Sequence, residues 1–147
     1  MKTNDKALGI IKHFEGCVLT SYQCPAGIWT IGIGSCWDFN GCRITGDYGP
    51  ITEEEAYDLL ALELRHVEKA IMILVKVPLT SDQFGALASF IYNIGSGAFQ
   101  RSTMRMKLNR LDYEGAADEF WKWRRGGGVI LPGLVRRRAV EAELFRQ

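Results

Sequence analysis

Long apolar runs are missing from this sequence of 147 residues. No stretch approaches the roughly 18 to 20 apolar residues that a membrane-spanning helix needs, so we expect a soluble chain without stable membrane association. Near the N-terminus the apolar stretch 7–11 is shorter than a signal-peptide core and is followed by Lys12 and His13, so we expect no signal peptide. Internal repeats and low-complexity segments are also absent, which argues against a repeat protein or a disordered chain.

Paired Cys-x-x-Cys spacing, the usual mark of a structural zinc site, is missing as well. The four cysteines all lie within the first 42 residues, at Cys17, Cys24, Cys36 and Cys42. We therefore predict no metal and no cofactor. A disulfide between Cys36 and Cys42 can close the five residues between them in an oxidising compartment, whereas a reducing one leaves four free thiols.

The sequence also lacks a large net charge. The chain carries only +1 at neutral pH. The distribution is uneven: residues 101–147 hold 11 basic and 6 acidic side chains, and residues 1–100 hold 7 and 11. A basic C-terminal part suits an anionic polymer, nucleic acid or cell-wall glycan, or is a solvated helix face. The three arginines at 136–138 spread around a helix instead of forming one groove-facing row, so we expect no nucleic-acid partner.

What is present suits one compact globular unit, with 47% hydrophobic and 24% charged residues. Helical spacing of apolar residues predicts a first helix over 3–14, which Gly16 ends. Residues 17–34 change to the pattern of two short strands around a proline- and glycine-containing turn. The segment 35–50 has no clear period, and we predict a loop or a third short strand around 43–45.

Two capping boxes mark the starts of further helices. Thr52 and Glu55 precede apolar residues at steps of three and four, which predicts a helix of about 22 residues that ends before Pro78. Thr80 and Gln83 begin a nearly all-apolar helix that we expect to be buried.

The last third of the chain is predicted to be helical. We expect three helices there, near 102–110, 113–123 and 134–146. The predicted architecture is α+β, with a small lobe of short strands over about 15–51 and a connecting helix over about 52–74. A helical lobe over about 75–147 takes in the first helix, and a cleft between the lobes would pass Glu15 and the hairpin.

Glu15 is the first candidate for chemistry. Cleavage of a glycosidic bond needs a protonated carboxylic acid beside the leaving oxygen, and apolar neighbours favour the protonated form. His13, Phe14 and the hairpin aromatics Tyr22 and Trp29 can supply such surroundings. A glutamate at a helix end is by itself usually a surface residue, so the assignment needs further support.

That support comes from a resemblance. Glu15, followed by the letters GIWTIGIG at 27–34, is similar to the signature of the phage-type lysozymes, the muramidase family of T-even phage endolysins and their prophage relatives. Further similar segments follow in the same order, at 77–84, 92–103, 112–117 and 131–138. The resemblance covers essentially the whole chain and implies a single domain over 1–147 with the family's two-lobed lysozyme-like fold.

The resemblance also implies the catalytic residues. The family's catalytic glutamate falls on Glu15, its catalytic aspartate on Cys24 and its active-site threonine on Thr30. A thiol has an ordinary pKa of about 8.5 and is mostly protonated at neutral pH. Cys24 can position a water, act as a base when ionised, or attack the anomeric carbon. We expect water activation shared with Thr30.

Other site residues follow from the same register. Gly34 and Ser35 end the hairpin motif, and Ser35 stands where the family usually has a histidine. The insertion 36–48 follows at once, so we expect a rebuilt rim on that side of the cleft. Tyr92 and Asn93 fall where the family places an aromatic and an amide in the cleft floor, although Tyr92 also fits core packing.

Two more contacts are carried over, because Ser102 and Arg124 lie near other glycan or peptide contacts of the family. The resemblance implies a peptidoglycan hydrolase that causes bacterial lysis by cutting the β-1,4 bond between N-acetylmuramic acid and N-acetylglucosamine with inversion. Two alternatives stay open. One is a lytic transglycosylase that uses Glu15 alone, with the sugar's 6-hydroxyl as nucleophile. The other is a glycan-binding relative that has lost its chemistry at Cys24.

The family further implies how the enzyme meets its substrate. We expect a monomer that accumulates in the host cytoplasm and acts on peptidoglycan in the periplasm and cell wall. Access to the wall would require a membrane lesion made by a separate holin.

Overall fold

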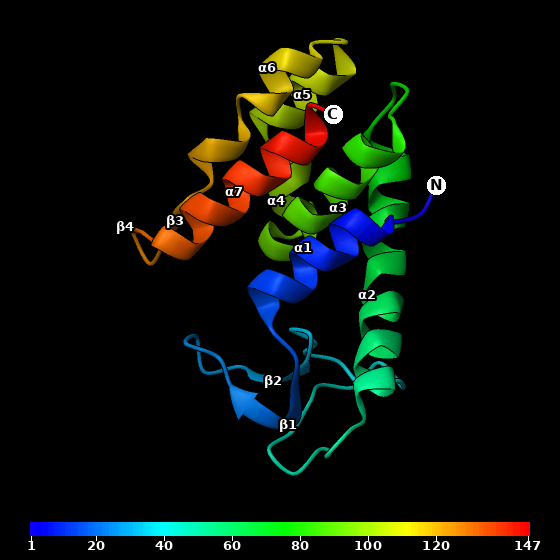
Figure 1. The fold of residues 1–147 in the computed structure, drawn as a ribbon, viewed down its shortest axis with the longest axis vertical. Helices are drawn as coiled ribbons and strands as arrows, with labels where there is room; N and C mark the ends of the chain where they lie inside the picture. Colours follow the sequence, from blue (N-terminus) through cyan, green and yellow to red (C-terminus); the bar gives the residue numbers. More distant parts are fainter. The chain divides into compact units, whose positions relative to one another are not determined.

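Helices form most of the chain, and two small antiparallel hairpins form the rest of its regular structure (Figure 1). The computed structural model describes residues 1–147 throughout. The elements in chain order are α1 (Asp5–Glu15), β1 (Val18–Gln23), β2 (Trp29–Gly32), α2 (Glu53–Leu74), α3 (Ser81–Ile94), α4 (Ser96–Gln100), α5 (Thr103–Asn109), α6 (Tyr113–Ala117), the 3-10 helix η1 (Phe120–Lys122), β3 (Arg125–Gly126), β4 (Val129–Ile130) and α7 (Pro132–Phe145). The predicted α+β class is confirmed.

The chain divides into two compact units, and the division falls inside α1 and α2. One unit contains residues 11–66 and holds the first hairpin. The other contains residues 1–10 and 67–147 and is helical apart from the short β3–β4 hairpin. None of the helices combines the length and the apolar character that crossing a membrane requires.

The hairpin of the 11–66 unit pairs β1 with β2 in antiparallel register, with Tyr22 opposite Thr30. Its turn closes because the Gly27 amide donates to the Cys24 carbonyl at 2.8 Å, and Gly27 has a φ of 79° that few other residues tolerate. Of the two possibilities predicted around 43–45, a loop or a third short strand, the strand is not formed. In its place the loop 36–44 folds back on itself through a single antiparallel bridge.

The long helix α2 begins at the predicted capping box. The Thr52 hydroxyl accepts from the Glu55 amide at 3.1 Å, and the Glu55 carboxylate accepts from the Thr52 amide at 3.0 Å. Leu59, Leu60 and Leu64 are buried along one face of the helix, as their spacing requires. The predicted start and the predicted length of about 22 residues are both confirmed.

The core of the larger unit is built around α3, whose residues 84–91 are all buried. This helix packs most extensively against α7. The ring of Phe90 meets those of Phe120 and Trp123 edge-on, at centroid distances of 5.1 and 5.7 Å. The prediction of a buried helix after Thr80 is confirmed.

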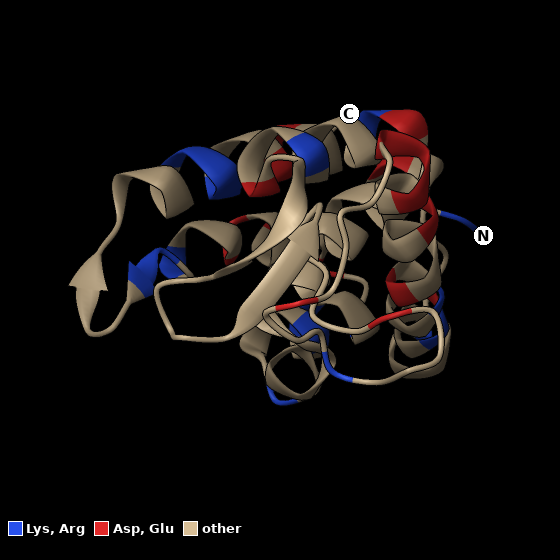
Figure 2. Cartoon of the chain, turned by 90° about the horizontal axis from the view of Figure 1, so that it is seen from below, with Lys and Arg blue, Asp and Glu red and all other residues tan.

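An ion network is buried in the same unit, where α7 carries both basic and acidic residues (Figure 2). The Glu141 carboxylate is fully buried and accepts from Arg137 at 3.2 Å and from Arg138 at 2.5 Å. The Ser89 hydroxyl of α3 donates to it at 2.5 Å. Arg137 also donates to the Ser89 carbonyl, so the network ties α7 to α3.

The C-terminal third departs from the prediction in its details. The predicted helix over 113–123 is broken into α6 and η1. The last helix begins at Pro132 instead of 134, because proline fits the first turn of a helix, where its missing amide is not needed. Gly127 and Gly128 have φ values of 59° and 82° and form the turn of the β3–β4 hairpin, which lies between the predicted helices 113–123 and 134–146 and was not predicted.

Candidate active site

Glu15 is the last residue of α1 and is partly buried. The helix ends there because Gly16 takes a φ of 74°, a left-handed conformation that glycine adopts at little cost. The Gly16 amide still donates to the Lys12 carbonyl at 2.8 Å, so the last turn is closed. The carboxylate of Glu15 is thus held on a helix end and not on a free loop.

The backbone of Gly34 packs closely against the carboxylate of Glu15. A Cβ atom on Gly34 would lie 2.8 Å from Oε1 of Glu15 and 3.1 Å from its carboxyl carbon, closer than real side-chain contacts. The φ of Gly34 is 79°, which also disfavours other residues. The glycine therefore lets the backbone lie directly beside the carboxylate of Glu15.

Cys24 lies at the start of the hairpin turn, where its amide donates to the Ile28 carbonyl at 2.9 Å. A hydrogen bond from the Ile28 backbone, followed by smaller contributions that include the Thr30 hydroxyl, lowers the pKa of the Cys24 thiol below its ordinary value despite an opposing effect of desolvation. A lowered pKa increases the fraction of thiolate, the basic form of the side chain.

Thr30 is almost fully buried and lies in β2. Its hydroxyl contacts the Ile28 carbonyl at 3.0 Å and the Cys36 sulfur at 3.9 Å. The pKa of Cys36 is raised, mainly because this thiol is partly buried. The Thr30 hydroxyl also interacts with Cys24. It therefore contacts two thiols, one with a lowered pKa and one with a raised pKa.

Tyr22 lies next to Thr30 and is influenced by the charge of Glu15. It stands opposite Thr30 in the hairpin, and its pKa is raised first by burial and then by the negative charges of Glu15, Cys24 and Cys36. The sequence suggested Tyr22 only as part of the surroundings of Glu15 and gave Cys36 no role at the site. The pairing of Tyr22 with Thr30 follows from the hairpin register, whereas no sequence signal indicated the contact of Cys36.

Ser35, the last predicted residue of this group, is fully buried. Its backbone exchanges two hydrogen bonds of 2.9 Å with Ile31, which closes the turn that carries Gly34. The Ser35 hydroxyl has no hydrogen-bond partner. The 11–66 unit therefore contains all five predicted residues of the hairpin region, Glu15, Cys24, Thr30, Gly34 and Ser35.

The other four predicted contacts belong to the larger unit. Tyr92 is partly buried in the last turn of α3, and Asn93 is exposed. The Asn93 side-chain oxygen accepts from Arg138, and Asn93 lines a cavity of about 350 Å³ together with Lys122 and Arg125. The cavity is basic, which suits an anionic or polar ligand, but a role for Tyr92 or Asn93 stays a prediction.

Ser102 and Arg124 have structural contacts of their own. The Ser102 hydroxyl caps α5, donating to the Phe99 carbonyl at 2.7 Å and accepting from the Arg105 amide at 3.1 Å. The Arg124 guanidinium lies 4.5 Å from the ring centroid of Trp121. The predicted substrate contacts of Ser102 and Arg124 stay predictions.

The hairpin region of the 11–66 unit holds the functional groups of an acid–base site. It offers a carboxyl group, a buried hydroxyl and a thiol with a lowered pKa, which together can donate a proton and orient a water molecule. No cluster of three or more His, Cys, Asp or Glu side chains is arranged to bind a metal ion, and all four cysteines are free thiols.

The chain is similar to proteins of known families. Residues 12–141 match the family described as Phage lysozyme. The chain is 42% identical to the endolysin of Acyrthosiphon pisum secondary endosymbiont phage 1, over 99% of this chain and 98% of that protein.

Solved structures show the same similarity. A crystal structure of a variant of P22 lysozyme matches with a TM-score of 0.87 and 36% identity, covering 100% of this chain and 99% of that one. An endolysin from the Escherichia coli phage FAHEc1 matches with a TM-score of 0.89 and 35% identity, covering 99% and 93%.

Proposed function

Because the chain belongs to the phage lysozyme family and is a peptidoglycan-degrading lytic enzyme, we propose that it hydrolyses the β-1,4 bond between N-acetylmuramic acid and N-acetylglucosamine. The family, the enzyme class and the lysozyme-like fold expected from the sequence are confirmed by these similarities. The bond that is cut and the roles of individual residues are the content of the proposal.

In the proposed mechanism, Glu15 donates a proton to the glycosidic oxygen as the bond to the anomeric carbon breaks. A water molecule attacks the opposite face of that carbon, which inverts its configuration. The Thr30 hydroxyl orients this water, and the Cys24 thiolate accepts its proton. The catalytic groups are restored when Glu15 is reprotonated and Cys24 loses its proton to solvent.

The observation that carries this proposal is that Glu15, Cys24 and Thr30 lie in one compact unit, where Tyr22 stands opposite Thr30 and is influenced by the charges of Glu15 and Cys24. The Thr30 hydroxyl interacts with Cys24, whose lowered pKa favours the basic form required of a proton acceptor. The close approach of the Gly34 backbone fixes the position of the Glu15 carboxylate beside the hairpin. These features favour a chemical role for Cys24 over its being a chance replacement of an aspartate.

Product analysis tests the proposal. Purified peptidoglycan is digested with the wild type, Cys24→Ser and Cys24→Asp, and the muropeptides are analysed by mass spectrometry after reduction. We expect the wild type and Cys24→Asp to release products with new reducing ends. Cys24→Ser should be slower by about 100-fold, the usual contribution of a general base.

Each alternative has its own outcome in the same experiment. Products that lack one water are anhydro-muropeptides and identify a lytic transglycosylase that uses Glu15 alone. Wall binding without cleavage by the wild type, and no gain in Cys24→Asp, would identify a glycan-binding relative. Full activity of Cys24→Ser would overturn the role proposed for Cys24.

The route to the wall is part of the same proposal and rests on the family resemblance. In this proposal the enzyme is a monomer that collects in the host cytoplasm and reaches the peptidoglycan through a lesion made by a holin. Expression in a host with and without a coexpressed holin tests the route, because lysis should occur only with the holin. Light scattering of the purified protein tests the monomeric state.

A further inference from the structure

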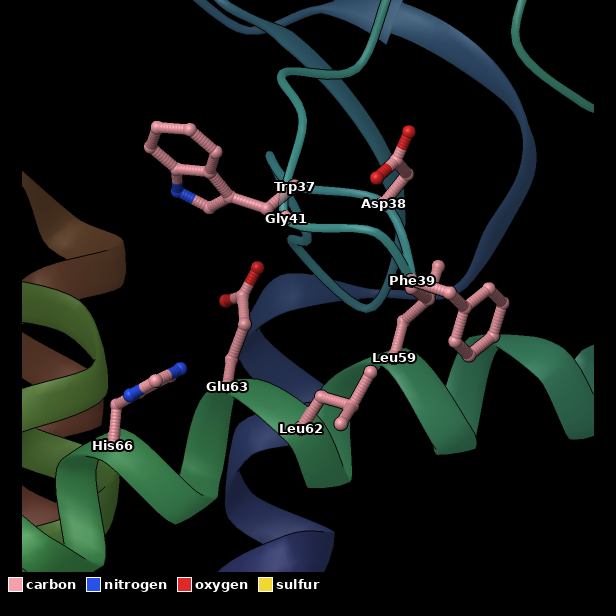
Figure 3. A pocket seen from close by; sticks show the side chains of 8 residues that line it. All are labelled: Trp37, Asp38, Phe39, Gly41, Leu59, Leu62, Glu63 and His66. Carbon is pink, nitrogen blue, oxygen red and sulfur yellow. The ribbon is translucent and has the colours of Figure 1, made fainter.

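The 11–66 unit contains a second hollow that none of the proposed catalytic residues lines. It lies between the loop 37–41 and α2 and has a volume of about 370 Å³, within the usual range of small-ligand sites (Figure 3). Its lining residues are Trp37, Asp38, Phe39, Gly41, Leu59, Leu62, Glu63 and His66. The loop belongs to the insertion for which the sequence predicted only a rebuilt rim.

Two carboxylates line this cavity. They belong to Asp38 and Glu63, and the nearby cation is Arg43, which stacks on the ring of Trp37. Hydrogen bonds hold both acids in place. The Asp38 carboxylate accepts from the amides of Asn40 and Cys42 at 2.8 and 2.9 Å, and Glu63 accepts from the Cys36 amide at 3.3 Å. Two carboxylates held in place favour a cationic group on the ligand.

The walls suit a cation that is carried on an apolar stem. In Figure 3 the carboxylate of Glu63 lies between the indole of Trp37 and the imidazole of His66, and Leu62 and Phe39 lie toward the other end. Trp37 is 44% exposed, and the Arg43 guanidinium stacks at 4.2 Å from its ring centroid. Arg43 thus covers one part of the indole, and the exposed remainder offers a ligand cation the aromatic side chain best suited to this interaction.

We propose that this cavity binds the alkylammonium side chain of the diamino acid in the peptide stem of peptidoglycan. The ammonium group lies against the Glu63 carboxylate and the Trp37 ring, and the methylene groups pack on Leu59 and Leu62. The cavity thus recognises the peptide of the wall in addition to its glycan. This inference rests on the proposed function, because it assumes that the substrate is peptidoglycan.

A binding titration tests the proposal without catalysis. The full-length protein is titrated with Nα-acetyl-lysine amide and, separately, with the Nα,Nε-diacetyl compound, while the indole N–H signals are followed by NMR. We expect the free amine to shift the Trp37 signal and to bind about five-fold more tightly than the acetylated compound, the usual strength of one such ion pair.

Charge-matched variants locate the effect. Glu63→Gln keeps the acceptor for the Cys36 amide and should weaken binding of the free amine about five-fold. Asp58→Asn removes the same charge from an exposed position of α2 outside the cavity and should leave binding unchanged. Trp37→Leu, with binding measured by calorimetry because the Trp37 signal is lost, provides a second test at the cavity should Glu63→Gln not fold.

Kinetics on two wall preparations complete the test. On peptidoglycan with free side-chain amines, Glu63→Gln should raise KM about five-fold at unchanged kcat, and on amine-acetylated peptidoglycan the variant and the wild type should match. Equal binding of the two lysine compounds, or an equal loss in Asp58→Asn, would overturn the proposal. Because the titration needs no turnover, it still decides if the proposed hydrolysis itself fails.

Discussion

Glu15 and Glu141 are two helical glutamates with opposite surroundings. Glu141, in the larger unit, is fully buried and accepts hydrogen bonds from Arg137, Arg138 and Ser89. Glu15, in the 11–66 unit, is only partly buried and stands at a helix end beside the bare backbone of a glycine.

The difference separates a structural carboxylate from a candidate catalytic one. A carboxylate held by two buried guanidinium groups joins helices, and it has no room for a substrate atom. The Glu15 carboxylate, by contrast, belongs to a residue that is only partly buried, so a ligand can reach it. Residue type alone therefore does not assign the role of either glutamate, whereas the surroundings do.

The largest expected effect comes from removing each charge in turn. Glu15→Gln should lower the rate of wall hydrolysis about a thousand-fold, because the proton donor is lost, and it should leave the folded protein intact. Glu141→Gln should instead lower the free energy of unfolding by about 3–5 kcal/mol, because it removes a buried carboxylate that two buried guanidinium groups contact.

Turbidity of wall suspensions and denaturant unfolding measure the two quantities on both variants. The comparison fails if Glu15→Gln keeps a tenth of the activity, or if Glu141→Gln is as stable as the wild type. Activity of Glu141→Gln should be expressed per folded molecule, so that lost stability is not counted as lost catalysis.

A smaller effect on activity is expected from replacing Gly34, the glycine that contacts Glu15. Gly34→Ala places a Cβ atom 2.8 Å from Oε1 of Glu15 and forces alanine into a left-handed conformation. We expect a loss of about 1–2 kcal/mol in stability and about 100-fold in activity, since a displacement of about 1 Å at a catalytic group has such consequences.

Gly9→Ala is the matched control for this change. Gly9 lies in the middle of α1, and nothing lies within 4 Å of the position of a new Cβ atom. Alanine should stabilise the helix there by about 0.5–1 kcal/mol and leave activity unchanged. Equal activity of the Gly34 and Gly9 variants would show that the contact of Gly34 with Glu15 does not affect catalysis.

A third prediction concerns the two thiols next to Thr30. The pKa of Cys24 is lowered and that of Cys36 is raised, so iodoacetamide should alkylate Cys24 several-fold faster near neutral pH. Below the pKa of Cys24 the thiol is protonated and cannot accept a proton. Activity should therefore fall as pH drops through that pKa, in a window below the ordinary thiol range.

Mass spectrometry of labelled peptides and a pH–rate profile check this prediction. In Cys24→Asp the acidic fall of the profile should move to lower pH, because a carboxyl group has a lower pKa than a thiol. Faster labelling of Cys36 than of Cys24, or an unchanged profile in Cys24→Asp, would contradict the assignment.

The smallest effects are expected at the two capping boxes, one in each unit. Thr52→Ala and Thr80→Ala each remove the side-chain acceptor at a helix start and should lower the free energy of unfolding by about 1 kcal/mol. Amide exchange should increase in the first turn of α2 for one variant and of α3 for the other. Stability equal to the wild type in both would show that the boxes contribute nothing measurable.

Local chemistry explains which parts of the fold were predictable. The boxes at Thr52 and Thr80 fixed two helix starts, because capping depends only on residues three positions apart. The helix α4 (Ser96–Gln100) was missed because Gly95 and Gly97 indicate a chain break. The β3–β4 hairpin was missed because its strands are only two residues each and leave no periodic pattern.

The candidate site was also predictable only in part from the sequence. The register of the lysozyme signature indicated Glu15 and Thr30, and the structure places both in the hairpin unit. The contact between Thr30 and Cys36 depends on the turn through Gly34, which no residue spacing predicts. Glu63 was not considered because its role at the loop arises only when α2 packs beside that loop.

The hydroxyl of Ser35 is buried without a hydrogen-bond partner, and such a group costs about 1–3 kcal/mol. The fold therefore tolerates a local loss of stability one residue away from the glycine that contacts Glu15. Evolution commonly accepts such a loss where function constrains the backbone. For an engineer, position 35 is a place where stability can be gained without changing a charged group. The activity of such a stabilised variant would measure the trade-off between stability and activity.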